Sequence, residues 1–254
     1  MSAFVIAHNT FRETVRDRLM AGVLVAGAAL LAVTQIATPL ALGEGRRLTV
    51  DLGLSSISLL GLFVVVLVGT SLVAKELDRR TIYNLLSRPI ARPAYLLGKW
   101  LGITAALLAL ALALGGALAL LLAWRGWMVS AASLAQGVYL AGLELAVVAA
   151  VAVMFSALST PVLSALYTLG LYAVGQWSDD LRAFAAHFPP ALGRIVGALA
   201  DVVPNLPLFN MRTLVADGRP TTALHLALAT GYALTYVACV LALGAAAFER
   251  KDFK

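Results

Sequence analysis

The sequence predicts an all-α membrane protein with six transmembrane helices, and its composition carries most of that prediction. Of its 254 residues, 61% are hydrophobic and only 13% are charged. A soluble domain of ordinary composition is about half apolar and about a quarter charged. A chain of this size could not bury so much apolar surface in water, so soluble enzymes, nucleic-acid-binding proteins and disordered proteins are poor candidates. The net charge of +6 is then best explained by membrane orientation and lipid contact.

Six runs of mainly apolar residues are candidate spans, since about 20 such residues cross the hydrocarbon core. The third run is long enough to tilt or protrude, and the fifth is short. Lysine and arginine are more numerous in the segments that an inside N-terminus would place inside, which predicts an N-in/C-in topology. We therefore expect one transmembrane domain over residues 1–254, multi-pass in the cell membrane, in bacteria the inner membrane. The spans cover about residues 19–42, 52–74, 94–123, 133–158, 161–176 and 222–248.

The N-terminal segment, residues 1–18, has the pattern of an amphipathic helix that lies in the membrane interface. Apolar and polar residues separate onto two faces at helical spacing, which is typical of helices that lie flat on a bilayer. The alternative is a simple basic lead-in to the first span. The apolar face contains Phe4, His8, Phe11, Val15 and Leu19, and the polar face contains Asn9, Arg12, Glu13, Arg16 and Asp17.

The most polar stretch is the loop 75–93, which an inside N-terminus would place in the cytoplasm. Residues 81–86 are compatible with a short helix that carries Ile82, Leu85 and Leu86 on one side. Pro89 and Pro93 would then stop helix formation. A short amphipathic helix on an inner loop offers a surface that a soluble partner can bind.

The last outer loop, residues 177–220, contains signals for short helices. Ser178 followed by Asp179 and Asp180 is a typical helix N-terminus, and Pro189–Pro190 would break that helix. Residues 191–203 show apolar positions at helical spacing but are too few to span a bilayer, and they include Arg194 and Asp201. A re-entrant or surface-lying helix pair fits this pattern best.

Two features inside the predicted spans stand out. Glu144 is an acid near the middle of the fourth span, where a carboxylate is costly and usually faces a bundle interior or a water-filled cavity. Its role is either functional, lining a pathway, or structural, hydrogen-bonded at a helix–helix contact. Gly98 and Gly102 are spaced to permit close helix approach at the inner end of the third span.

Motifs for catalysis are missing from the sequence. It contains no GxxxxGK[ST] phosphate-binding loop, HExxH, GxSxG or CxxC, and its one cysteine, Cys239, has no partner for an intramolecular disulfide. The histidines, His8, His187 and His225, are scattered along the chain. We therefore expect no catalytic residues and no metal site, and a transporter built from this chain would need an external energy source.

The loop 75–93 resembles the corresponding loop of ABC-2 type transporter permeases. In that family an acidic residue follows the second span, a Gly-Thr-Ile/Leu-like step and Leu-Leu-Ser-x-Pro come next, and Gly-Lys opens the third span. Arg80 stands where the family commonly has glycine. The overall layout is also similar, as is, more weakly, the stretch from Pro204 to Asn210. The matching residues are Lys75-Glu76-Leu77-Asp78-Arg79-Arg80-Thr81-Ile82-Tyr83-Asn84-Leu85-Leu86-Ser87-Arg88-Pro89-Ile90, then Arg92 and Gly98-Lys99.

The resemblance implies a mechanism in which two permease units pair in the membrane and each docks a cytoplasmic ABC ATPase. ATP and Mg would be bound by that partner, and no cofactor by this chain. The N-terminal helix, with Phe4, Phe11, Arg12 and Arg16, would flank the coupling segment. ATP binding would push these elements and rock the two bundles. The residues implied in ATPase coupling are Glu76, Asp78, Arg79, Arg80, Thr81, Ile82, Leu85, Leu86 and Arg88.

Three functions follow as hypotheses. The first is the membrane subunit of an ATP-driven ABC-2 exporter. The second is a gradient-driven secondary carrier that uses Glu144. The third is a membrane scaffold without flux, including an ABC-like complex that does mechanical work. The substrate cannot be deduced from the residues.

Overall fold

The computed structural model describes residues 3–71, 92–185 and 187–249, and the regular secondary structure within these ranges is helical. Five of its helices are long and apolar enough to cross a membrane, which agrees with the predicted class of multi-pass membrane protein. A bent pair of helices, residues 192–202 and 207–216, meets the same test when it is counted as one span. The five are α2 (Arg18–Ala37), α3 (Gly45–Leu67), α6 (Arg92–Trp124), α7 (Ala131–Leu158) and α12 (Ala223–Glu249).

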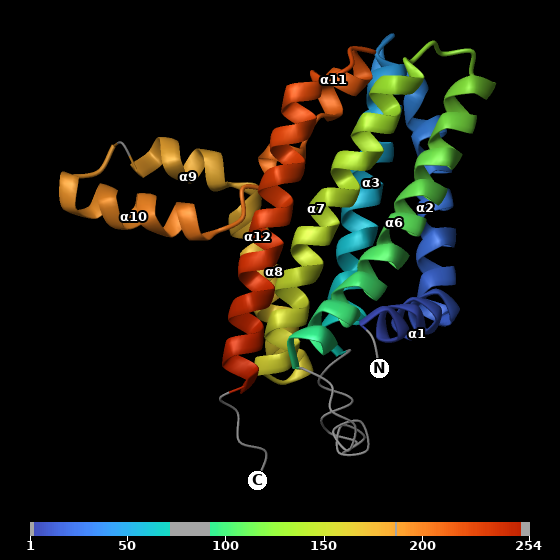
Figure 1. The fold of residues 1–254 in the computed structure, drawn as a ribbon. Helices are drawn as coiled ribbons and strands as arrows, with labels where there is room; N and C mark the ends of the chain where they lie inside the picture. Colours follow the sequence, from blue (N-terminus) through green and yellow to red (C-terminus); the bar gives the residue numbers. More distant parts are fainter. Residues whose placement is uncertain (1–2, 72–91, 186, 250–254) are drawn as a thin grey trace.

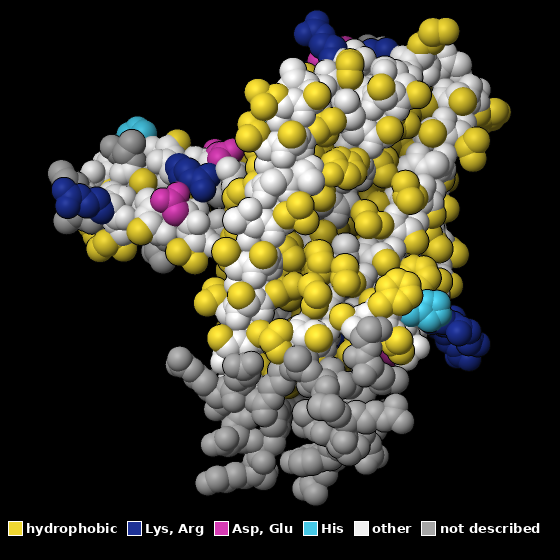
Figure 2. Space-filling view, viewed as in Figure 1, with side chains coloured by type: hydrophobic (Ala, Val, Ile, Leu, Met, Phe, Trp, Pro, Cys, Tyr) yellow, Lys and Arg dark blue, Asp and Glu magenta, His cyan; other side chains and the backbone are white. Residues whose placement is uncertain are grey.

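These helices stand side by side in one bundle with two distinct ends (Figure 1). At one end lie α1 (Ala3–Arg16), the start of α6 and the last turn of α12, and we name it the α1 end. At the other lie α11 (Arg212–Ala216), the short helix η1 (Thr38–Ala41) and the connection between α6 and α7, and we name it the α11 end. The side of the bundle in view is covered mainly by hydrophobic side chains, with lysine and arginine gathered toward the ends (Figure 2).

Most predicted span boundaries lie within a few residues of the observed helices, but the start of one span differs and the length of another is short. The second span begins at Gly45 rather than near residue 52, because charged Arg46, Arg47 and Asp51 were expected in a loop but belong to the first turns of α3. Helix α8 (Pro161–Gln176) has the predicted limits, yet its 16 residues are only about 24 Å long. That is shorter than a hydrocarbon core of about 30 Å, so length alone does not make α8 a sixth span.

Helix α7 is the centre of the bundle, with α3, α6, α8 and α12 packed around it. Within its candidate span 78% of the residues are buried, compared with 22% for α2 at the periphery. Lipid provides no hydrophobic drive for helices to associate, so close packing of small side chains has to hold them together. A Cβ atom added to Gly61 of α3 would overlap the side chain of Leu145, which shows how closely α3 and α7 approach.

Helix α1 crosses the α1 end and packs on α6 at the two glycines singled out in the sequence (Figure 1). A Cβ on Gly98 would lie 2.8 Å from the carbonyl oxygen of Ala3, and one on Gly102 would lie 2.6 Å from that of Ala7. Asp17 then separates α1 from α2: its backbone is extended, and its side chain accepts a hydrogen bond of 3.0 Å from the Leu19 amide.

The face of α1 that packs on the bundle is a different one from the apolar face predicted to lie in the membrane interface. The buried residues of α1 are Ile6, Thr10 and Thr14. Phe4 is 77% exposed, whereas Phe11 is partly buried against the core. The glycine notch of α6, formed by Gly98 and Gly102, accepts small and β-branched side chains, and Phe4 is left exposed.

The chain between α8 and α12 forms a helical hairpin and a short capping segment. The α9–α10 hairpin consists of α9 (Ser178–Ala185) and α10 (Pro190–Val202), and it projects sideways from the bundle (Figure 1). The capping segment, residues 204–216, contains η3 (Pro207–Phe209) and α11 and leads back to the α11 end. The predicted helix start at Ser178 and the break at Pro189–Pro190 are confirmed.

Candidate functional site

Glu144 lies in the middle of α7 and joins three helices through its carboxyl group. Ser58 of α3 donates a hydrogen bond of 2.8 Å from its hydroxyl to Oε2. Gln176, the last residue of α8, donates one of 2.6 Å from its amide to Oε1. The Glu144 side chain is almost fully buried, at 4% exposure. Both carboxyl oxygens therefore have partners, and those partners come from different helices.

The capping segment closes over this cluster from the α11 end. Phe209, Asn210, Met211 and Arg212 line a small void that also touches Glu144 and Ser58. The void measures about 10 Å³, roughly the space that one water molecule needs. Arg212 is close enough to interact electrostatically with Glu144. The cluster is thus a closed polar centre and not an open cavity.

Close packing holds the capping segment on the bundle. A Cβ on Gly175, next to Gln176, would lie 2.9 Å from the carbonyl oxygen of Pro204 and 3.0 Å from a methyl carbon of Leu206. The backbone N–H of Asn205 donates a hydrogen bond of 2.8 Å to the Tyr232 hydroxyl of α12. The stretch from Pro204 to Asn210, noted in the sequence for its family pattern, is therefore the part of the chain that covers Glu144.

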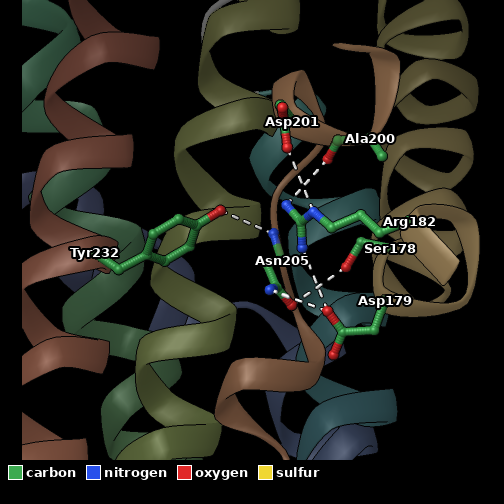
Figure 3. Close-up of polar contacts among 7 residues, drawn as sticks. All are labelled: Ser178, Asp179, Arg182, Ala200, Asp201, Asn205 and Tyr232. Carbon is green, nitrogen blue, oxygen red and sulfur yellow. Dashed lines mark hydrogen bonds and ion pairs between the residues drawn. The ribbon is translucent and has the colours of Figure 1, made fainter. Parts of the chain in front are cut away.

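A second polar cluster lies at the root of the α9–α10 hairpin (Figure 3). Arg182 of α9 forms ion pairs of 3.3 Å with Asp179 and 3.4 Å with Asp201 of α10. Asn205 accepts a hydrogen bond of 3.2 Å from the Ser178 hydroxyl and donates one of 3.3 Å to Asp179. These contacts fix the two hairpin helices to each other and to the start of the capping segment.

The root cluster lies about halfway along the bundle. Tyr236 of α12 donates a hydrogen bond of 3.1 Å to the carbonyl oxygen of Val202, the last residue of α10. With a rise of about 1.5 Å per residue, Tyr236 is about 20 Å from the start of α12, which is about 40 Å long. Glu144 is also about 20 Å from the start of α7. The two polar clusters therefore lie at similar depth, one inside the bundle and one on its side.

The two clusters differ in exposure. Asp179 and Asp201 are 61% and 75% exposed in the single chain, and Arg182 is 37% exposed. The hairpin also exposes apolar side chains, among them Phe184 at 60%, Leu192 at 52% and Ile195 at 58%. The bundle covers neither these charged side chains nor these apolar ones.

The predicted coupling residues, Glu76 to Arg88, lie outside the described residues. Of the predicted residues on α1, Arg12 and Arg16 are exposed at the α1 end. The partners of Glu144 were missed by sequence reasoning, because Ser58 is 86 positions away and its hydroxyl alone carries no signal. A search for polar side chains within the predicted spans would have found Ser58, and Gln176 at the end of the fifth.

Metal binding has little support in the part of the chain that the structure describes. Histidine, cysteine, aspartate and glutamate side chains do not gather there in groups of three or more that could hold an ion. His225 contacts the carbonyl oxygen of Leu208 at 3.2 Å, and His187 contacts that of Ala183 at 3.1 Å, so each has a local backbone partner.

A bundle of helices long and apolar enough to cross a membrane, packed around a buried polar centre, is the fold of a multi-pass membrane protein. The family model described as "ABC-2 family transporter protein" matches residues 4–253. The chain therefore belongs to the ABC-2 family of transporter membrane domains. A search of curated proteins gives no significant match. Members of this family are membrane components of transporters and normally work with a separate ATPase subunit.

Proposed function

We propose that the chain is the permease subunit of an ATP-driven ABC-2 exporter, with six spans, both termini inside, and a cytoplasmic ABC ATPase as its partner. The observation that carries the proposal is the family match over residues 4–253, nearly the whole chain. In this proposal α8 is the fifth span although it is short. The second permease unit is an identical copy or a related chain.

The arrangement of the α1 end supports ATPase coupling at this end. The described chain ends at η2 (Gly69–Ser71) and resumes at Arg92, and both flanks of the loop 75–93 lie at the α1 end (Figure 1). Helix α1 packs on α6 within three turns of Arg92. An ATPase that binds the loop would therefore also be able to bind Arg12 and Arg16 of α1. Motion of that partner would reach α6 directly through the glycine notch.

The hairpin root supports pairing of two permease units. A charged side chain at the bilayer centre costs about 2.5–3.5 kcal/mol even on the mildest scale, and such groups face protein or a water-filled cavity. Asp179 and Asp201 lie near the middle of the bundle and are largely exposed in the single chain. A second unit beside the hairpin would cover these acids, or enclose water around them, and would cover Phe184 and Ile195.

In this proposal Glu144 holds the bundle together and is not the coupling group of a carrier. Its carboxyl group is buried, has a hydrogen-bond partner on each oxygen and borders a void of about 10 Å³. A carrier that binds and releases an ion there would need access from both sides of the membrane. The capping segment blocks such access from the α11 end.

The proposal is tested by purifying the tagged full chain from membranes in mild detergent and identifying what accompanies it by mass spectrometry. We expect an ATPase with a phosphate-binding loop in stoichiometric amount, and ATP hydrolysis that depends on the complex. An isolated oligomer without a nucleotide-binding partner, in several detergents, would contradict the proposal and favour the gradient-driven carrier. A stoichiometric ATPase whose activity accompanies no flux would favour the mechanical scaffold.

A further inference from the structure

An apolar groove runs along the bundle between the halves of α6 and α7 nearest the α11 end. Its volume is about 820 Å³, within the range of small-molecule pockets, about 300–1,000 Å³. The two helices diverge toward the connection that joins them (Figure 1). Small residues leave the space between them open. The lining includes Ala111, Gly115, Gly116, Ala119, Ala131 and Ala135.

The groove meets a polar pocket at the α11 end, and the indole ring of Trp127 is the wall between them. Trp127 lines both the groove and the second pocket, whose volume is about 510 Å³. The second pocket is lined by Arg46, Arg47 and Glu44. A Cβ on Gly45 would lie 3.5 Å from Cη2 of Trp127, so the edge of the ring rests on the first turn of α3. An apolar space and a basic pocket are thus adjacent.

Arginine side chains surround this junction. Arg46 donates a hydrogen bond of 3.2 Å from its guanidinium to the carbonyl oxygen of Met128, a residue that lines the groove. The guanidinium of Arg125 lies 5.7 Å from the ring centre of Trp124 and 5.6 Å from that of Trp127. Arg125 also donates a hydrogen bond of 2.6 Å to Gln35. Each arginine is therefore held in place while using only part of its five N–H donors.

Acidic groups near the junction reduce its positive charge without cancelling it. Glu44 lines the polar pocket, and Asp217 forms an ion pair of 3.5 Å with Arg47. Arg46 and Arg125 have neutral partners, a carbonyl and an amide oxygen. The part of the junction beside the groove is thus positive. With an inside N-terminus this end faces outward, where arginine is not favoured for orientation, so its presence calls for another explanation.

We propose that the groove and the polar pocket together bind one anionic membrane phospholipid. The acyl chain would lie along Gly116 and Ala135, and the phosphate would lie beside Arg46 and Arg125, at the level of the tryptophans. An apolar slot with cations and indoles at its mouth matches an amphiphile whose head is negative. This site is separate from the ATPase surface and from Glu144, so it stands or falls independently of the proposed transport function.

The test measures retained lipid on the full chain by native mass spectrometry, after exchange into micelles with equal amounts of phosphatidylglycerol and phosphatidylcholine. We expect one phosphatidylglycerol per chain, retained about tenfold over phosphatidylcholine; two arginines contribute about fivefold each at most. Equal retention of the two lipids would overturn the charge part of the proposal. Displacement by glycerol 3-phosphate alone would overturn the role of the groove.

Two variants separate the groove from the rest of the lipid-facing surface. A Cβ on Gly116 meets nothing within 4 Å, so Gly116→Leu fills the groove without disturbing the α6–α7 contact. Gly231→Leu on α12 is the matched control, because its site is equally open. We expect about a tenfold loss of retained phosphatidylglycerol in Gly116→Leu and no loss in Gly231→Leu. Equal retention in both, or a Gly116→Leu chain that changes only its oligomeric state, would refute lipid as the occupant.

A head-group variant and a direct labelling experiment complete the test. Arg46→Gln with Arg125→Gln should remove the preference for phosphatidylglycerol, whereas Arg194→Gln on the hairpin should keep it. A phosphatidylglycerol with a photoreactive acyl chain should label peptides of 108–139, in competition with unlabelled phosphatidylglycerol. This measurement uses the unmodified chain, so it tests the lipid proposal even if a variant fails to fold. Equal labelling of α12 would contradict the proposal.

Discussion

The Glu144 cluster and the root of the α9–α10 hairpin lie at similar depth in the bundle but satisfy their polar groups in opposite ways. Ser58 and Gln176 of the same chain donate hydrogen bonds to the two carboxyl oxygens of Glu144. Asp179 and Asp201 pair with Arg182 yet remain largely exposed. In a membrane the cost of a polar group depends on what surrounds it, so the first cluster serves the fold of one chain. The second is left exposed by the chain itself, and in the proposed function a second permease unit would cover it or enclose water around it.

The largest effect on the stability of the chain is expected for Glu144→Ala. It leaves the Ser58 hydroxyl and the Gln176 amide without their acceptor and opens a cavity, which should lower the free energy of unfolding by about 3 kcal/mol. Glu144→Gln is the control, and because it keeps one acceptor oxygen it should cost about 1 kcal/mol. Both are measured by thermal unfolding in detergent. Equal melting temperatures of the parent and Glu144→Ala would show that the cluster is not structural.

A smaller loss is expected for Gly102→Leu, which tests the contact between α1 and α6. The added side chain would meet Thr10 at 2.5 Å and the Ala7 carbonyl oxygen at 2.6 Å, so α1 has to shift. Overpacking of this kind costs about 1–3 kcal/mol, and protease cleavage in residues 3–16 should become faster. Gly22→Leu on α2 is the matched control, since nothing lies within 4 Å of its Cβ. Cleavage of α1 at equal rates in both variants would argue against the packed helix.

Charge reversal at the hairpin root should change assembly more than folding. Asp201→Arg breaks an exposed ion pair with Arg182, which costs about 0.5 kcal/mol in the isolated chain. The dimer fraction in nanodiscs, measured by crosslinking, should fall about tenfold, because a second unit would meet an uncompensated positive charge. Asp217→Arg, which breaks the comparably exposed pair with Arg47 at the α11 end, is the control. An equal dimer fraction in the two variants would remove the hairpin from the interface.

The smallest effect on stability is expected for the paired exchange Glu76→Arg with Arg79→Glu, which should change it by less than about 0.5 kcal/mol. The same exchange should release the ATPase or uncouple its activity, because the loop 75–93 is proposed as its docking surface. Co-purification and ATP hydrolysis are the measurements. The control is Glu44→Arg with Arg219→Glu at the opposite end, which also keeps the net charge. It should leave co-purification and ATP hydrolysis unchanged. Full yield and full activity of the loop variant would contradict the coupling role.

The sequence predicted the elements well and their contacts poorly, for physical reasons. Apolar runs locate spans because each helix satisfies its own backbone in lipid. The predicted start of the second span was wrong because Arg46 and Arg47 suggest a loop. Their partners in the structure, Met128 and Asp217, are distant in the sequence and could not be seen there. The face of α1 that packs on α6 was not predicted for a related reason: hydrophobicity draws attention to Phe4, but the notch at Gly98 and Gly102 accepts Ile6 and Thr10.

The candidate site was predicted only in part. Glu144 was found because an acid in mid-span is rare. Its partners depend on how α3 and α8 pack against α7, and the segment above it depends on the path of the chain after α8. The short length of α8 was visible in the sequence. The consequence is a hairpin that leaves the bundle near mid-depth. That depth could be located only from the hydrogen bonds that Tyr232 and Tyr236 make in the structure.

The unbroken length of α6 has a mechanical consequence. Its 33 residues make a rod about 50 Å long, which starts where the loop 75–93 ends and finishes at Trp124. A tilt of about 5° about a pivot near its middle moves each end of such a rod by about 2 Å, in opposite directions. Because α7 supports α6 along much of its length, the pivot lies between the two ends. If an ATPase pushed the α1 end, as proposed above, the motion would reach the α11 end within a single helix, without passing through any loop.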